Sequence, residues 1–587
     1  MKTDESNKSK VLIVSSNHKL DGTSEIWGTG GWQPPDKRED IDWITFVYLL
    51  GWAAIIVSPD NLNANLLNNG CFKWIIFACP METIDDVTFK ILKERAKEDS
   101  IMILFRQTTY DKGLSETTKS MIINKRKSSF NIQWQGPGKK RSWKCLNSFS
   151  IFPLKLDVND DIWAKIDHFP LIKARKIGER SHFVYLGFHP SEARDSEGSI
   201  TALLKHLFIF GIEKPVAWID WVGSMLLRMD DPGSSQTVHH NTYKDVNKLN
   251  LRQWDSIRQI LKKYHACLTI GYVSGWVDDG NKERGFLSVD NVNVTRVPGS
   301  VFPSPVVKYI RKLGSQEKLY DYQDEYSGIF NLVKEGLIDI AVHGYTHIFP
   351  DFKKWLAASN CYEAENWYSE FSTDGMDYIN TEVKNGRPHP LEKAVDLIIK
   401  FFNTRPTTLI NPREKFTNTI LKKALDLNFK LISSYYMAIR IENKFCWTQH
   451  ICSPYLDKAD PSWFKSELPV VGYFHDFDIS RFGSRWLDHN LHAWNKAGAF
   501  NFYDFNTLST ILDSSIDLIR ENNQYVLQIN TERQLEFKNP VRIYFKFTSS
   551  EKINQIKVRN LTQEKYAKFY MLTEKIGFIL LRNTFPQ

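Results

Sequence analysis

The chain has 587 residues and contains no apolar run long enough to cross a membrane. A membrane-spanning helix needs about 20 apolar residues, and the run at 52–57 fits a buried strand instead. The polar N-terminus is followed only by a short apolar run at 11–14, too short for the apolar core of a signal peptide. We therefore expect a soluble, cytoplasmic protein without a membrane span.

Several other signatures are missing. The seven cysteines are odd in number and widely spaced, with no C-x-x-C pair, which excludes a disulfide framework and a zinc knuckle as leading interpretations. No G-x-G-x-x-G loop opens a predicted helix, so phosphate binding of that type is excluded too. The net charge of +8 is small for this length, and we expect no nucleic-acid partner.

Hydrophobic patterning predicts a multidomain α/β protein. In residues 1–208, short apolar runs alternate with amphipathic segments, which predicts a parallel sheet covered by helices, of the Rossmann or flavodoxin type. Residues 209–515 alternate in the same way and form a second predicted α/β domain. Residues 516–587 change to period-2 alternation, which predicts a small antiparallel β domain.

Residues of the types that bind metals follow predicted strands of the central domain. The carboxyl ends of parallel strands are where α/β barrels carry their active sites, so we expect these side chains to meet. They are Asp230 and Asp231 after residues 225–229, His343 and His347 after residues 338–342, and His475 after residues 470–474.

These residue types suit a divalent metal, for which we expect zinc. His343 and His347 present both imidazoles to one point if their segment takes a helical turn, which Gly344 helps to bend. One carboxylate completes a set of two histidines and an acid, with positions open for water and substrate. Zinc would lower the pKa of bound water from 15.7 toward about 7 and polarise a carbonyl oxygen. The pattern therefore favours hydrolysis of an amide or ester.

Three segments resemble motifs of the polysaccharide deacetylase superfamily, also called NodB-like or carbohydrate esterase family four. L-L-R-M-D-D resembles the first motif, which implies Asp230 as the catalytic base and Asp231 as a metal ligand. A-V-H-G-Y-T-H resembles the second and implies His343 and His347 as ligands, whereas Y-F-H-D-F-D implies His475 as the acid. The resemblance implies a divergent member with a distorted (β/α) barrel over residues 209–515. It also implies removal of acetyl groups from an N-acetylated amino sugar, polysaccharide or glycan precursor.

The chain departs from the family at the third motif, where R-P-P-Y-G is replaced by N-P-R at 411–413. Whether Arg413 or Arg228 orients the base is therefore open. Asn411, Arg413 and Trp367 are our candidates for substrate binding. Two alternatives stay open, namely a metal-dependent hydrolase of another C–N or glycosidic bond, and a catalytically silent carbohydrate-binding protein on the same fold.

Overall fold

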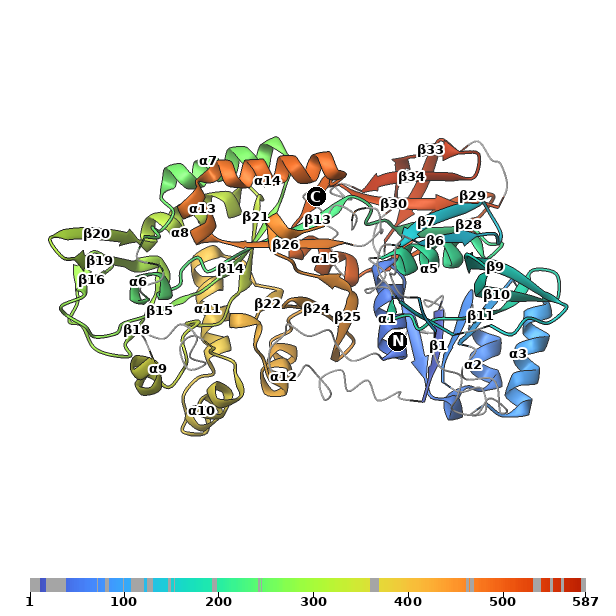
Figure 1. Ribbon diagram of the computed structural model, residues 1–587, viewed down its shortest axis with the longest axis horizontal. Helices are drawn as coiled ribbons and strands as arrows, with labels where there is room; N and C mark the ends of the chain where they lie inside the picture. Colours follow the sequence, from blue (N-terminus) through green and yellow to red (C-terminus); the bar gives the residue numbers. More distant parts are fainter. Residues whose placement is uncertain are drawn as a thin grey trace.

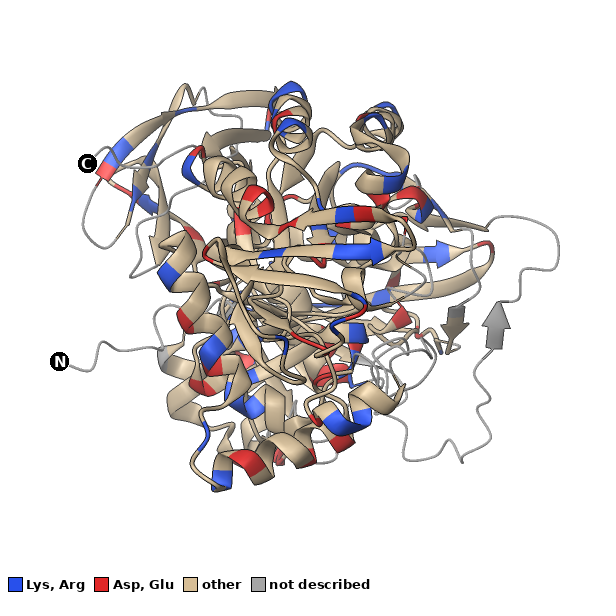
Figure 2. Ribbon diagram, turned by 90° about the vertical axis from the view of Figure 1, so that its left-hand side faces the viewer, with Lys and Arg blue, Asp and Glu red and all other residues tan. Residues whose placement is uncertain are grey.

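The computed structural model shows a mixed α/β protein whose N-terminal and C-terminal regions lie together at one end, with the central region forming the other end (Figure 1). Positively and negatively charged residues are interspersed along the same elements (Figure 2). The structure describes residues 11–16, 38–70, 72–79, 84–98, 100–106, 121–123, 130–145, 149–152, 154–192, 198–240, 243, 245–358, 369–460, 464, 469–530, 540–548, 553–560 and 564–581.

The N-terminal sheet is mixed rather than parallel throughout. Its order is β2-β1-β3-β4-β11-β10-β9-β6-β7, and the expected parallel pairing holds only from β2 to β11. The remaining pairs are antiparallel, and in three of them, β6–β7, β9–β10 and β10–β11, the strands follow one another along the chain. The strands are β1 Val11–Ser15, β2 Ala54–Val57, β3 Trp74–Ala78, β4 Met102–Arg106, β6 Phe130–Trp134, β7 Arg141–Cys145, β9 Asp160–Ile166, β10 Phe169–Ile177 and β11 Ser181–Leu186, with β5 Met121–Ile123 and β8 Phe149–Ile151 paired separately.

Helices cover both faces of this sheet, which explains why its parallel strands are apolar at consecutive positions. Val11 and Ile13 of β1 belong to one buried cluster, and Leu12 and Val14 belong to another on the opposite face. The first cluster includes residues of α1 and α5, and the second includes residues of α2 and α3. These helices are α1 Glu39–Leu49, α2 Ala64–Asn69, α3 Asp86–Glu98 and α5 Ser199–Phe210.

The central sheet has the order β25-β24-β23-β22-β21-β14-β13-β26, with β27 also paired to β13. Pairs from β26 to β23 are parallel, whereas β24 and β25 form an antiparallel extension at one edge. The strands are β13 Ser224–Asp230, β14 Leu268–Tyr272, β21 Ile338–Val342, β22 Thr408–Ile410, β23 Leu431–Ser433, β24 Tyr436–Ile441, β25 Lys444–Cys452, β26 Val470–His475 and β27 Asn501–Tyr503.

The expected distorted (β/α) barrel is not confirmed. Strands β25 and β26, at the two edges, form no ladder with each other in the described part of the chain, so the sheet is not closed. The β24–β25 hairpin ends the sheet at one edge, and among the described residues only an isolated bridge between Tyr455 and Tyr473 of β26 joins it to the other edge. Helix α1 of the N-terminal region packs against β25 there (Figure 1). The central sheet is therefore open, and another domain covers part of its edge.

Helices cover the outer face of the central sheet. The first long helix, α7, begins with a capping box, because the Asn250 side chain accepts from the Gln253 N–H and the Gln253 side chain accepts from the Asn250 N–H, both at 3.0 Å. The helices on this face are α7 Leu251–Lys263, α8 Tyr322–Lys334, α10 Thr373–Lys384, α11 Pro390–Phe402, α12 Asn418–Asp426, α13 Asp476–Phe482 and α14 Ser484–Ala497. Helix α15 Phe505–Leu512 packs on the opposite face, and α6 Gln236–His239 and α9 Phe352–Ala358 belong to smaller buried clusters.

An insertion between β14 and α8 forms a further small sheet that the hydrophobic pattern did not predict. It extends from the central region at the end remote from the N-terminal region (Figure 1). The sheet order is β17-β16-β19-β20, next to a separate β15–β18 pair. The strands are β15 Gly275–Val277, β16 Gly285–Val289, β17 Val292–Asn293, β18 Val301–Pro303, β19 Val307–Leu313 and β20 Gln316–Asp321.

The C-terminal residues form two four-stranded sheets. The expectation of antiparallel pairing is wrong at one position, because β29 and β31 are parallel. Strand β12, which precedes the central sheet, joins β30 here. The domain boundaries at 208 and 515 stay predictions. The sheets are β28-β29-β31-β32 and β12-β30-β34-β33, with β12 Val216–Ile219, β28 Ser515–Glu521, β29 Gln524–Asn530, β30 Val541–Lys546, β31 Gln555–Arg559, β32 Glu564–Lys568, β33 Tyr570–Thr573 and β34 Ile576–Leu581.

One buried cluster joins the three regions. It contains Trp43 of α1, Phe545 of β30 and residues such as Leu226 from the inner face of the central sheet. Hydrogen bonds reinforce it, since the Trp52 indole donates to the Ala217 carbonyl and the Trp221 indole donates to the Leu49 carbonyl, each at 2.7 Å. The regions therefore share a core. None of the described helices has the length and apolar character that a membrane crossing requires.

Replacing Asn250 with Ala should lower the free energy of unfolding by about 1 kcal/mol, because the capping box at the start of α7 is lost. Chemical denaturation measures this change. Gln259→Ala, at an exposed position of the same helix, is the matched control and should change stability by less than about 0.5 kcal/mol. Equal effects of the two substitutions would contradict the capping role.

Candidate metal centre

The five metal-type and acid–base residues expected from the sequence lie together at the carboxyl edge of the central sheet. Asp230 ends β13 and His475 ends β26, and the two residues are register partners on adjacent parallel strands. Asp231 follows β13 directly, and His343 follows β21 directly. Parallel neighbours end at the same edge, so strand order brings these side chains together.

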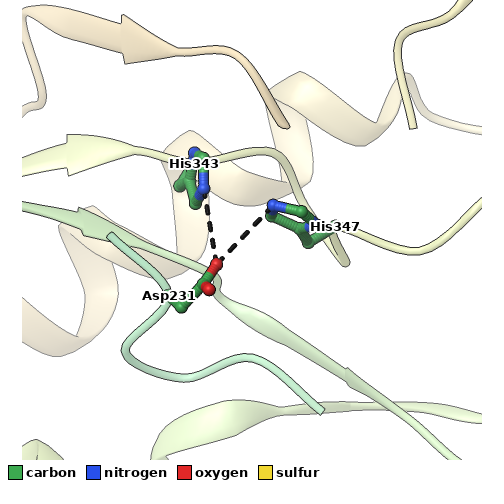
Figure 3. A group of neighbouring side chains, drawn as sticks. All are labelled: Asp231, His343 and His347. Atoms are coloured by element: carbon green, nitrogen blue, oxygen red, sulfur yellow. Dashed lines mark ion pairs between the residues drawn. The ribbon is translucent and has the colours of Figure 1, made fainter. Parts of the chain in front are cut away.

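Asp231, His343 and His347 form a compact buried group (Figure 3). The Oδ1 atom of Asp231 lies 3.5 Å from Nε2 of His343 and 3.6 Å from Nε2 of His347. Two donors held at about 2.1 Å by a tetrahedral zinc ion are about 3.4 Å apart. The spacing and chemistry of the three donors therefore fit a divalent metal ion.

The orientation of His343 is fixed by a hydrogen bond on its other nitrogen. Its Nδ1 lies 3.1 Å from the carbonyl oxygen of Ile410, at the end of β22. A ring nitrogen facing a carbonyl carries the proton, which leaves Nε2 with the lone pair that a metal ligand needs. The contact thus selects the tautomer that points its lone pair toward Asp231.

The segment that carries the two histidines is a bent loop and not the helical turn predicted from their spacing. Gly344 and His347 both have left-handed backbone conformations, with φ of 71° and 61°. Asp231 is left-handed as well, with φ of 79°. Such conformations are uncommon for residues other than glycine and concentrate at functional sites.

Glu370 replaces the hydrogen bonds that a helical turn would have supplied. Its Oε2 accepts from the backbone N–H groups of Tyr345 at 2.9 Å, Thr346 at 3.2 Å and His347 at 2.9 Å. A Cβ atom on Gly344 would lie 2.3 Å from the same oxygen, so the close approach requires glycine there. A buried carboxylate therefore sets the shape of the histidine loop.

Arg228 is the guanidinium that orients Asp230, which answers the question left open by the altered third motif. Its Nε and Nη2 donate to the two Asp230 oxygens at 2.8 and 2.5 Å, and Nη2 also lies 2.9 Å from Glu414. Burial alone would raise the pKa of Asp230, but Arg228 and His343 together lower it below its usual range. Asp230 is therefore held as an ionised carboxylate.

His475 is held on one side by a hydroxyl and a carboxylate. Its Nδ1 lies 3.1 Å from the Tyr455 hydroxyl and 3.7 Å from Oδ2 of Asp478, which also accepts the His475 backbone N–H at 2.8 Å. Burial would lower the pKa of His475, but Asp478 first, and then Asp231 and Asp230, raise it to about 9. His475 is therefore protonated at neutral pH when no cation offsets these carboxylates.

The three candidate substrate-binding residues differ in their placement. Asn411 follows β22 and is fully buried, and neither atom of its side-chain amide has a hydrogen-bond partner in the described structure. Arg413 lies with Nη1 at 3.5 Å from Oγ of Ser369. Trp367 lies outside the described residues.

The sequence patterns assigned no catalytic or metal-binding role to Glu370, Glu414 or Tyr455. The sequence did indicate the contact between Arg228 and Asp230. Residues two apart on a strand point to the same side, and this places Arg228 beside Asp230. Glu370 carries no such signal, since its contact with the histidine loop joins segments that local periodicity cannot relate.

No protein-family model matches the chain, and no curated protein sequence matches it. Among solved structures, similarity is found to the carbohydrate deacetylase Agd3, with a TM-score of 0.37, 8% identity, and 98% of this chain and 97% of that chain covered. A protein described as a polysaccharide deacetylase, from Mycobacterium smegmatis, gives a TM-score of 0.30 and 12% identity over 50% of this chain and 92% of its own. The Bc1960 peptidoglycan N-acetylglucosamine deacetylase gives a TM-score of 0.24 and 10% identity, with 48% of this chain and 86% of that chain covered. These values assign neither a family nor an activity to this chain.

Replacing Glu370 with Gln should weaken metal binding about 10–100-fold, because an amide oxygen accepts the three N–H groups less strongly than a carboxylate. Titration of metal-depleted protein with zinc against a competing chelator measures the affinity. Glu392→Gln is the matched control, since Glu392 also accepts a backbone N–H, that of His389, but at the start of α11. Unchanged zinc affinity in Glu370→Gln would contradict this role.

Proposed function

We propose that this chain is a metal-dependent hydrolase that removes acetyl groups from an N-acetylated amino sugar, polysaccharide or glycan precursor. The observation that carries the proposal is the buried Asp231, His343 and His347 group, with the carboxylate of Asp230 and the imidazole of His475 beside it. The resemblance of the three sequence motifs to polysaccharide deacetylases supports the choice of substrate.

Asp231, His343 and His347 would hold the metal, for which we propose zinc. When bound, the ion supplies Lewis-acid chemistry, polarising a carbonyl oxygen and lowering the pKa of water. The protein's part is to present three prearranged donors. The hydrogen bond from His343 to Ile410 and the Glu370 contacts with the loop maintain that arrangement.

Asp230 is proposed as the general base that accepts a proton from the attacking water. A base must be ionised before the reaction, and the paired hydrogen bonds from Arg228 keep Asp230 in that form. The same hydrogen bonds fix both carboxylate oxygens in position. Ser433 completes the support, because its hydroxyl lies 3.2 Å from Nη1 of Arg228.

His475 is proposed as the general acid that protonates the leaving amine. Its Nδ1 faces Tyr455 and Asp478, so Nε2 is the nitrogen left to donate a proton to substrate. Because His475 and Asp230 end adjacent strands in register, one group on each strand can act on the same substrate. A carboxylate that accepts a proton and an imidazolium that donates one match the two proton transfers of amide hydrolysis.

Asn411 and Arg413 remain our candidates for substrate contact. The buried amide of Asn411 offers both a donor and an acceptor, which is the pattern that recognises an acetamido group. Arg413 would contact more distant polar groups of a carbohydrate.

The function is tested by metal analysis of the purified protein together with acetate release from a panel of N- and O-acetylated glycans. We expect bound zinc and acetate release from N-acetylated substrates. His343→Ala should lose both metal and activity, whereas His475→Ala should keep the metal and lose turnover by about 10²–10⁴-fold. Full metal content in His343→Ala, or full turnover in His475→Ala, would refute the corresponding role.

The pH dependence of kcat/KM provides a separate test of the acid. His475 must be protonated to act, so activity should fall as pH rises through its pKa. Since Asp478 raises that pKa, Asp478→Asn should lower it and move the alkaline limb to lower pH. A bound metal ion would also lower the pKa of His475, because its positive charge offsets the negative charges of Asp230 and Asp231. An alkaline limb that stays at the wild-type pH in Asp478→Asn would show that His475 is not the titrating acid.

A further inference from the structure

A buried lysine lies between the segment that carries Asp231 and the segment that carries His475. The ammonium of Lys248, whose side chain is only 1% exposed, lies 2.6 Å from Oδ2 of Asp476 and 3.0 Å from Oε1 of Glu325. It also lies 5.1 Å from the centre of the Tyr322 ring. All three partners are buried.

The first of these segments is the loop that follows Asp231. Glu325 accepts the N–H of Gly233 at 2.8 Å, and the Tyr322 hydroxyl donates to the Ser234 carbonyl, also at 2.8 Å. Gly233 is left-handed, with φ of 85°, and a Cβ there would lie 2.1 Å from the Val273 carbonyl oxygen. The N-terminal turn of α8 thus fixes the loop in a conformation with little freedom.

The second segment begins with the proposed acid. Asp476 follows His475 directly and is the first residue of α13, the same turn in which Asp478 contacts His475. Lys248 is therefore the common partner of one carboxylate next to the acid and one carboxylate that holds the metal-ligand loop.

Stability alone does not call for this arrangement. Replacing buried ion pairs with apolar side chains of similar volume is often neutral or stabilising. Here two buried carboxylates share one ammonium, so the cluster holds more acidic groups than basic ones. The same cluster does, however, join the Asp231 loop to the segment of His475 through short contacts on both sides of Lys248.

We propose that Lys248 is a positioning residue that keeps the metal-binding loop and the general acid at a fixed separation. This inference rests on the proposed function, because it assigns the two linked segments to metal binding and proton donation. Lys248 itself contacts neither the Asp231 side chain nor the His475 side chain among the interactions described, so its action passes through Glu325 and Asp476.

The test compares Lys248→Met, which keeps the length of the side chain and removes its charge, with Lys263→Met. Lys263 forms an ion pair of the same type, 2.6 Å from Asp488, but its side chain is 55% exposed. Metal-depleted proteins are titrated with Co²⁺, and its absorption spectrum reports ligand geometry. In Lys248→Met we expect a changed spectrum and about 10–100-fold weaker Co²⁺ binding, with no change in Lys263→Met.

Steady-state kinetics at saturating metal give a second measurement. Lys248→Met should lower kcat for acetate release about 10–100-fold while KM stays within about threefold, since the link orients catalytic groups and not substrate. A third protein, Lys248→Met with Glu325→Gln and Asp476→Asn, removes all three buried charges. We expect its melting temperature to return to that of the wild type, while kcat stays as low as in Lys248→Met. If Lys248→Met does not fold, the triple variant replaces it in both measurements.

The outcomes separate the two proposals. If the wild-type protein binds no metal, both the proposed metal centre and the proposed role of Lys248 are wrong. If the wild-type protein binds Co²⁺ and Lys248→Met shows the same spectrum and affinity, only the proposed role of Lys248 is wrong. Recovery of kcat together with the melting temperature in the triple variant also overturns it, because charge burial would then account for the whole effect.

Discussion

Charge removed from water must be balanced nearby by opposite charge or by hydrogen bonds, and the carboxyl edge of the central sheet is organised by this constraint. Asp230 is balanced by Arg228, Asp476 by Lys248, and Glu370 by three backbone N–H groups. Asp231 faces two imidazoles, which must be neutral to act as ligands. That is the point at which a divalent cation would balance the Asp231 carboxylate.

The remainder of the molecule gives this edge its rigidity. Helices cover the outer face of the central sheet, while its inner face joins the cluster shared with the N-terminal and C-terminal regions. The groups of the site are therefore mounted on strand ends and tight loops whose backbones are fixed from both sides. Catalytic groups held in this way can be prearranged, so little reorganisation is needed during a reaction.

Local sequence patterns were sufficient to predict which candidate residues lie together at the ends of strands. The positions of Asp230, His343 and His475 follow from strand periodicity and from the rule that parallel strands end together. The helical turn expected at His343–His347 was wrong because Glu370, from a distant segment, supplies the hydrogen bonds. The distorted barrel is not confirmed, and the antiparallel β24–β25 hairpin at one edge of the open sheet depends on a short turn that strand periodicity does not describe.

The pairing of β12 with β30 has a consequence for biosynthesis. Val216 is the register partner of Lys546, and β30 is the only strand with which β12 pairs in the described residues. While the ribosome is still producing the central region, the edge of β12 that pairs with β30 has no partner strand. This sheet therefore cannot be completed until residues 541–546 have been translated, a delay during which protection by chaperones would be valuable.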